Sequence, residues 1–179
     1  MSKEIIILSG SPRKNGNTQL LTDAFKKGAE AAGNKVNVFD VAQMNIAACK
    51  GCEYCTLHQG ECIQRDDMQI IMPYLYTANT IVFSTPVYYY GMTAQLKLAL
   101  DRMYATLTKK SSLESCVLLA VYGDTDTTVV EPLVEQYKAF TGYSGWDNLG
   151  IITVPGMNEK GEISGHLALK EAEELGRSL

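Results

Sequence analysis

The sequence lacks the features that mark membrane, secreted and nucleotide-hydrolysing proteins. None of its stretches is apolar for long enough to cross a membrane. The apolar run Ile5–Leu8 is too short for a signal peptide, and a Gly-rich turn follows it at once. Neither a G-x-x-x-x-G-K-[ST] loop nor a G-x-G-x-x-G fingerprint is present, which argues against an ATPase or a dinucleotide-binding fold. We therefore expect a cytoplasmic protein of another class.

The net charge is also small, and histidines are few. The net charge is only −4 and both signs are mixed along the chain, so neither nucleic acid nor a membrane is expected as a partner. The two histidines, His58 and His166, stand in no Ser/His/Asp or metal-ligand arrangement. The length of 179 residues fits one domain. In the cytoplasm the five cysteines should be reduced thiols or ligands, not disulfides.

What is present is an alternation of two kinds of segment. The apolar, β-branched runs predict strands at 4–9, 35–40, 80–85, 115–122 and 149–154. The stretches with helical spacing predict helices at 17–32, 66–77, 92–107, 129–141 and 165–179. Strands that are apolar on both faces suit a parallel sheet covered by helices. Five strands, each followed by a helix, predict a doubly wound α/β fold.

The loop after the first expected strand has the composition of an anion site. It is rich in Gly, Ser and Asn and leads into a helix, so backbone N–H groups and the positive end of a dipole meet there. The hydroxyls of Ser11 and Thr18 and the amide of Asn17 add donors. Arg13 or Lys14 neutralises a phosphate. An ordinary βα turn has the same composition, and that alternative stays open.

A second loop, Pro86–Gly91, follows the third expected strand. Ligands of doubly wound sheets lie outside the carboxyl ends of the strands, so this loop should lie beside the first. Pro86 fixes the turn, Gly91 permits close approach, and the tyrosines between them offer a flat surface to a ring. Edge packing or an oligomer contact is the alternative role of these tyrosines. With the loop at Gly123 and Asp124, the three loops predict a pocket for a phosphorylated, ring-bearing molecule.

These loops carry a resemblance to a known family. The runs Gly10–Thr18 and Pro86–Gly91, with Gln95-Leu96-Lys97 and Asp101-Arg102, resemble the NADPH-dependent FMN reductase group of flavodoxin-like proteins, essentially from end to end. The resemblance implies one flavodoxin-like domain over residues 1–179, a three-layer sandwich around a five-stranded parallel sheet of order 2-1-3-4-5.

The resemblance also implies a cofactor and an activity. FMN would take electrons from NAD(P)H and pass them to a small acceptor such as a flavin or a quinone, in a homodimer or homotetramer with the flavin near a subunit interface. The expected FMN-binding residues are Ser11, Arg13, Asn15, Asn17, Thr18, Pro86, Val87, Tyr88, Tyr89, Gly91, Gly123 and Asp124. The cofactor performs the chemistry, so no catalytic side chain is expected. We expect backbone N–H groups of the Pro86–Gly91 loop and of the Gly123 loop to stabilise the anionic reduced flavin ring.

Four cysteines form the second strong signal. The spacing Cys49-x-x-Cys52-x-x-Cys55, followed by Cys62, lets a loop wrap its thiolates around one cluster. It resembles the iron–sulfur flavoproteins, which carry a [4Fe–4S] cluster beside FMN. A cluster here, close to FMN within the chain or across a subunit interface, would make ferredoxin a candidate donor. Zinc and free thiols stay open as alternatives. The loop is followed by Asp66-Asp67-Met68, and relatives with a similar loop followed by Asp-Asp-Met are not known to carry a cluster. Cys116 is expected in the core.

Two other functions compete with a reductase. A flavodoxin-type electron carrier would have no substrate of its own, but such carriers are more acidic and lack a basic residue in the phosphate loop, where this chain has Arg13 and Lys14. A nonenzymatic adaptor stabilised by zinc would be colourless and free of flavin.

Overall fold

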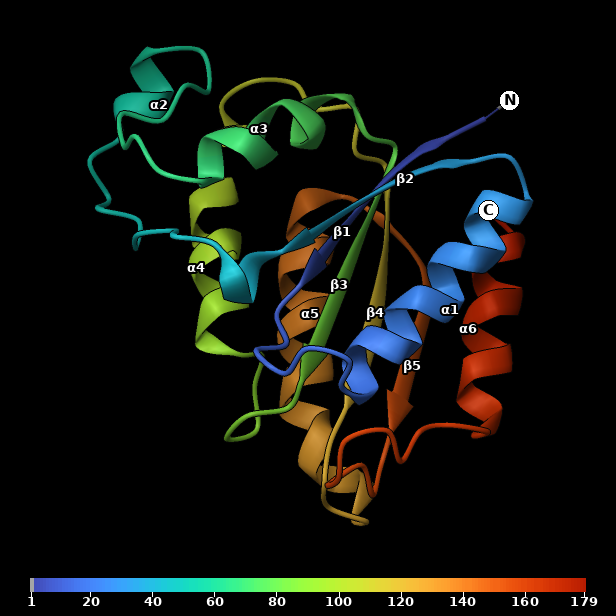
Figure 1. The fold of residues 1–179 in the computed structure, drawn as a ribbon. Coiled ribbons are helices and arrows are strands. Elements are labelled where there is room, and N and C mark those ends of the chain that lie inside the picture. Colours follow the sequence, from blue (N-terminus) through green and yellow to red (C-terminus); the bar gives the residue numbers. More distant parts are fainter. Residues whose placement is uncertain (1) are drawn as a thin grey trace.

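The structure, a computed structural model, describes residues 2–179 and is built on one parallel sheet (Figure 1). Its strands are β1 (Glu4–Ser9), β2 (Lys35–Asp40), β3 (Thr80–Pro86), β4 (Ser115–Val121) and β5 (Asp147–Val154). They pair in the order β2-β1-β3-β4-β5, which confirms the predicted flavodoxin-like topology. The run Ile5–Leu8 is fully buried because helices cover both faces of its strand.

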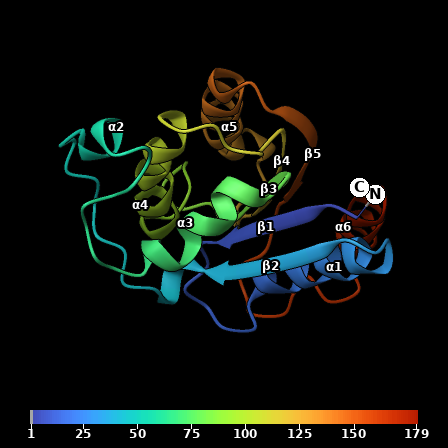
Figure 2. The ribbon, with the colours of Figure 1, turned by 90° about the horizontal axis from the view of Figure 1, so that it is seen from above.

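Helices form a layer on each side of the sheet (Figures 1 and 2). They are α1 (Asn17–Ala31), α3 (Met68–Thr77), α4 (Ala94–Arg102), α5 (Glu131–Ser144) and α6 (Leu167–Arg177), whereas the short α2 (Tyr54–Leu57) lies in the connection between β2 and α3. One buried cluster joins the sheet to α1 and α6, and another joins the opposite face to α3, α4 and α5. Among residues 2–179, no helix combines the length and apolarity needed to cross a membrane.

Local capping explains where several helices begin and end. Gly33, at φ +87°, closes α1 through the bonds Gly33 N to Glu30 O and Asn34 N to Ala29 O. The helix expected over 92–107 is shorter than predicted. It begins after Thr93, whose hydroxyl accepts from Leu96 N at 3.3 Å, and a 3-10 segment replaces its last part at 103–107.

Candidate functional site

A cavity of about 190 Å³ lies at the carboxyl edge of the sheet, where the loops after β1, β3, β4 and β5 meet. We call it the rim cavity. It is lined by Ser11, Arg13, Gly16, Asn17, Thr18, Pro86, Val87, Tyr88, Val121, Tyr122, Gly123, Met157 and Asn158. The three loops singled out in the sequence therefore do converge, as the strand-end rule requires.

One end of the rim cavity is suited to an anion. The α1 helix is preceded by Gly16, which offers no side-chain cap, and has no acidic residue in its first turn, so the N–H groups of that turn face no competing carboxylate. Thr18 is buried in this turn, and Arg13 is the one charged side chain among the described residues that line the cavity. These features fit a phosphate group.

Asn17 does something different from what its position in the loop suggests. Its side-chain amide donates to Glu159 O at 2.7 Å and accepts from Gly161 N at 2.9 Å and Ile163 N at 3.3 Å. The amide thus anchors the segment 159–163 against the start of α1. A contribution of Asn17 to anion binding would come from its backbone N–H.

On another side the rim cavity is lined by Pro86, Val87 and Tyr88, which lead into a two-residue turn. Tyr88 and Gly91 exchange backbone hydrogen bonds of 2.9 and 3.1 Å, and Tyr89 and Tyr90 occupy the turn with φ of +51° and +67°. Asn and Gly are the usual residues in such a turn, so two tyrosines are held there at a conformational cost. The positive φ values therefore fall on the tyrosines and not on Gly91, where an added Cβ would meet no atom nearer than 4.0 Å.

Most backbone donors of this turn are already used. The N–H of Val87 donates to Val121 O at 2.8 Å, and those of Tyr88 and Gly91 close the turn. Within the described chain, the N–H groups of Tyr89, Tyr90 and Gly123 form no such bond. If backbone donors of these loops contact a ring, these three are the candidates.

The structure separates the expected residues into two groups. Eight of them line the rim cavity, whereas Asn15, Tyr89, Gly91 and Asp124 do not. Tyr89 is 99% exposed. The N–H of Asn15 donates to the Gln19 side chain, and Asp124 accepts from Asp126 N.

Sequence reasoning missed the loop after β5. Asn158 donates from its side chain to Gly123 O at 2.9 Å and accepts from Arg13 at its own carbonyl at 3.0 Å, so it ties together two sides of the rim cavity. Met157 lines the cavity beside it. The signal was present in the sequence, because Gly156 and Asn158 follow a strand that ends at the same edge of the sheet.

A second cavity, of about 360 Å³, contains all four clustered cysteines, Cys49, Cys52, Cys55 and Cys62. We call it the cysteine pocket, and residues 47–66 the cysteine loop. Cys49 and Cys52 are exposed, whereas Cys55 and Cys62 are partly buried, and burial raises the pKa of the Cys55 thiol. The fifth thiol, Cys116, is buried in β4 as expected. No three His, Cys, Asp or Glu side chains of residues 2–179 converge closely enough to hold a single metal ion.

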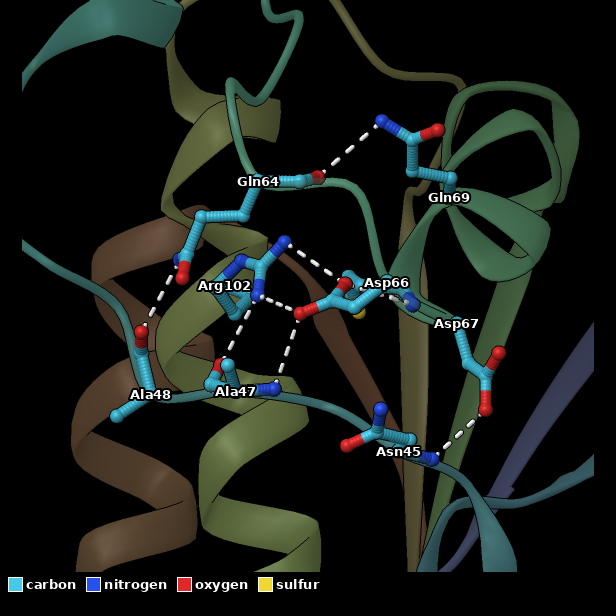
Figure 3. A network of polar contacts seen from close by, with 9 residues as sticks. Asn45, Ala47, Ala48, Gln64, Asp66, Asp67, Gln69 and Arg102 are labelled. Atoms are coloured by element: carbon cyan, nitrogen blue, oxygen red, sulfur yellow. Dashed lines mark hydrogen bonds and ion pairs between the residues drawn. The ribbon is translucent and has the colours of Figure 1, made fainter.

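Asp66 and Arg102 join the two ends of the cysteine loop (Figure 3). Arg102 Nη1 and Nη2 donate to the two oxygens of Asp66 at 2.6 and 3.1 Å, and Nη1 also donates to Ala47 O at 2.9 Å. Asp66 accepts from Ala47 N at 3.0 Å and from the N–H of Met68, the first residue of α3, at 3.1 Å. The side chains of Arg102 and Asp66 are only 1% and 9% exposed.

We expect this pair to make stability sensitive to acid. Burial alone would raise the pKa of Asp66, but Arg102 and the N–H groups of Ala47 and Met68 lower it below its usual value. A lowered carboxyl pKa stabilises the folded state above the ordinary value of about 4, and this contribution is lost as the pH falls through the folded pKa. Urea unfolding between pH 7 and pH 3 should show the loss, and Asp66→Asn should have a flatter profile over the acid limb.

The two cavities lie at opposite ends of α4. Thr93, which caps the start of α4, donates to Gly10 O at 2.8 Å in the loop after β1, which we call the first rim loop. Arg102, the last residue of α4, lines the cysteine pocket. Nine residues at 1.5 Å each make α4 about 13 Å long. The cysteine loop begins after β2, near the carboxyl edge of the sheet. It then runs alongside α4, away from that edge (Figure 1). Among the described residues, none lines both cavities.

Comparison with protein families and curated proteins finds flavin-related matches that cover different lengths of the chain. The family model described as NADPH-dependent FMN reductase matches residues 4–154. An iron-sulfur flavoprotein of Archaeoglobus fulgidus is 40% identical over 94 residues, which cover 52% of this chain and 42% of that protein. YwqN of Bacillus subtilis, whose name provisionally describes an NAD(P)H-dependent FMN-containing oxidoreductase, is 25% identical over 96% of both chains. The chain spans about half the length of the iron-sulfur flavoproteins that it matches.

Solved structures share the fold. An NAD(P)H:quinone oxidoreductase from Methanothermobacter marburgensis superimposes with a TM-score of 0.79 at 22% identity, covering 99% of this chain and 96% of that one. An azoreductase from Bacillus anthracis superimposes with a TM-score of 0.74 at 15% identity, covering all of both chains.

Proposed function

Since the chain belongs to the NADPH-dependent FMN reductase family, we propose that it is a flavin-containing reductase that binds FMN in the rim cavity. The observation that carries the proposal is the uncapped start of α1, which opens beside Arg13 into the rim cavity at the carboxyl edge of the sheet. Electrons would come from NAD(P)H and pass to a small acceptor such as a flavin or a quinone.

The proposal gives each part of the rim cavity a task. The first turn of α1, with Ser11, Thr18 and Arg13, holds the phosphate. Tyr88 provides a flat wall for the ring and excludes water from one side of it. Asn158 fixes the Gly123 loop and Arg13 relative to each other. FMN, when bound, supplies the capacity to accept a hydride and to release electrons singly or in pairs.

We propose further that the cysteine pocket holds a [4Fe–4S] cluster. All four cysteines line one pocket, and thiolates are the ligands of such clusters. The relatives named iron-sulfur flavoproteins match about half of this chain, which supports the assignment. A cluster would relay single electrons and would admit a ferredoxin as donor. Reduced cysteines require a reducing compartment, so the proposal includes the cytoplasm.

One preparation tests both cofactors. Protein purified without air should carry about one flavin per chain, by its absorbance near 450 nm, and about four irons with matching acid-labile sulfide, by chemical assay. A colourless protein would contradict the flavin proposal. Flavin without iron would contradict only the cluster. Zinc in place of iron would favour the adaptor.

Steady-state turnover distinguishes a reductase from an electron carrier. A reductase should oxidise NADPH or NADH continuously when a quinone or free flavin is supplied, whereas a flavodoxin-type carrier should not. The basic Arg13 in the loop after β1 favours the reductase, because flavodoxin-type carriers lack a basic residue there. Absence of turnover with both nucleotides, in protein that holds FMN, would contradict the reductase.

The tyrosine turn yields a paired prediction. Tyr88 lines the rim cavity, whereas Tyr89 does not line it and is 99% exposed. Tyr88→Leu should weaken FMN binding about tenfold through the loss of an aromatic contact. Tyr89→Leu should change it by less than about twofold, since the side chain makes no cavity contact. Titration of apoprotein with FMN, followed by flavin fluorescence, measures both, and equal losses would remove Tyr88 from the ring site.

Self-association is also part of the proposal. An apolar groove of about 380 Å³ lies between the end of α4 and α5, and the exposed side chains of Tyr104, Leu107 and Tyr143 line it. A second copy of the chain would cover this surface. Light scattering on the holoprotein should give a dimer or tetramer, and a monomer at micromolar concentration would contradict this.

A further inference from the structure

Several side-chain hydrogen bonds hold together the two stretches of chain that lead into and out of the cysteine loop, which we call its neck. Residues 45–48 and 64–67 lie beside each other, and four side chains bridge them (Figure 3). Besides the Asp66–Arg102 pair, Asp67 accepts from Asn45 N at 2.7 Å and Gln64 donates to Ala48 O at 3.0 Å. The cysteines themselves lie beyond this neck, so its geometry decides how the pocket is closed.

Arg102 differs from the other charged side chains of the protein. In the ion pairs of Lys27, Lys35 and Lys170 the lysine side chain is two-thirds or more exposed, whereas the side chain of Arg102 is 1% exposed. It makes a two-pronged contact with Asp66, the geometry in which a guanidinium fixes a carboxylate most strictly. Burying two charges is costly, so the burial of this pair is not by itself evidence that it adds net stability.

Arg102 also has one hydrogen-bond donor that no neighbouring group uses. Its Nε is buried and forms no hydrogen bond to any of residues 2–179. Arg102 and Cys62 together line both the cysteine pocket and a neighbouring cavity of about 300 Å³. A buried positive charge with an unused donor therefore stands in the same wall as one of the four thiols.

We propose that Asp66 and Arg102 are positioning residues that form the latch of the cysteine loop: they clamp its two ends onto the last turn of α4 and set a buried positive charge against the anionic group that the four thiolates hold. The chemical purpose of the latch rests on the cluster proposed above. Closure of the loop does not, and it can be tested in cluster-free protein. The latch also fixes the loop to α4, the helix whose capping residue, Thr93, donates to Gly10 O.

The thiols of the chain report on the latch without a cofactor. In reduced, iron-free protein, Asp66→Asn and Arg102→Gln should raise the rate at which iodoacetamide alkylates Cys55 and Cys62 by about tenfold, since local opening exposes partly buried groups. Cys49 and Cys52 are already exposed and should react as in the wild type. Peptide mass spectrometry separates the sites.

Two controls separate the latch from general unfolding. Cys116 lies in the core of β4 and should stay unreactive in every variant. Arg177→Gln removes an exposed arginine–glutamate pair on α6 and should leave all rates unchanged. Arg102→Lys keeps the charge and loses the fork, so it should give an intermediate opening. Unchanged Cys55 and Cys62, or a parallel rise at Cys116, would overturn the latch.

The charge has its own readout in protein reconstituted with iron and sulfide. Asp66→Asn removes a negative charge near the pocket and should raise the reduction potential of the bound group, whereas Arg102→Gln removes a positive charge and should lower it. A purely structural role would not produce opposite shifts, and shifts of the same sign would overturn the electrostatic role. Failure of every variant and the wild type to take up iron would contradict the cluster, while the alkylation rates would still decide the latch.

Discussion

Replacing Gly10 with alanine should abolish most of the affinity for FMN. A Cβ at this position would lie 2.6 Å from Thr93 Oγ1 and 2.7 Å from Leu96 Cβ. Gly10 is buried and held on both sides, by its N–H to Ser84 O at 2.8 Å and by Thr93 to its carbonyl at 2.8 Å. The new methyl group must therefore push the first rim loop away from α4. We expect the FMN dissociation constant to rise at least about 100-fold, or about 2.7 kcal/mol.

Fluorescence titration of the apoprotein measures this effect. Gly91→Ala in the ring loop is the matched control, because Gly91 has an ordinary φ and its Cβ would meet nothing closer than 4.0 Å. It should change the dissociation constant by no more than about threefold. Far-ultraviolet circular dichroism should confirm that Gly10→Ala is folded. An unchanged affinity in folded Gly10→Ala protein would show that the first loop does not bind the flavin phosphate.

The second large effect concerns the packing of α1 against α6. A Cβ on Gly28 would lie 1.9 Å from Glu173 O, a backbone atom that cannot turn aside, and 3.0 Å from Arg177 N. Gly176 faces α1 with the same closeness, since its Cβ would lie 2.1 Å from Phe25 O. The two helices must separate to admit one methyl group, which also opens the core beneath them.

Gly28→Ala should lower the free energy of unfolding by about 3 kcal/mol, although alanine is the better helix former. For a chain of this size the midpoint of thermal unfolding should fall by about 6 to 12 °C. Gly142→Ala in α5 is the control, because its Cβ would meet nothing within 4 Å, and it should stabilise the protein by up to about 1 kcal/mol. A Gly28→Ala protein as stable as the wild type would mean that α1 and α6 are not packed this closely.

The fold could be predicted because its signals are local. The apolar runs of β1, β3 and β4 are buried on both faces, and that pattern alone indicates strands of a covered parallel sheet. Strand ends then place the loops, so the convergence of the first rim loop with Pro86–Gly91 and Gly123 followed from topology. The four cysteines were singled out by their spacing, and in the structure they line one pocket.

Other features depend on residues that are far apart in the chain. Asn17 looked like a ligand, but its amide is taken by backbone groups more than 140 positions later. Asn158 was overlooked, because nothing in its neighbourhood says that Arg13 and Gly123 are its partners. The positive φ of Tyr89 and Tyr90 could not be predicted either, since only the closed pair of bonds between Tyr88 and Gly91 forces tyrosine into that conformation.

The sequence by itself therefore determined the sheet, the family resemblance, the Gly-, Ser- and Asn-rich composition of the loop after β1 and the cysteine spacing, because periodicity and turn chemistry act over a few residues. Only the tertiary structure decided how these parts are connected. It paired Asp66 with Arg102, 36 positions apart, and it put the cysteine pocket at one end of α4 and the rim cavity at the other. The physical reason is that burial and hydrogen bonding are satisfied in space, by whichever groups the packed helices bring together.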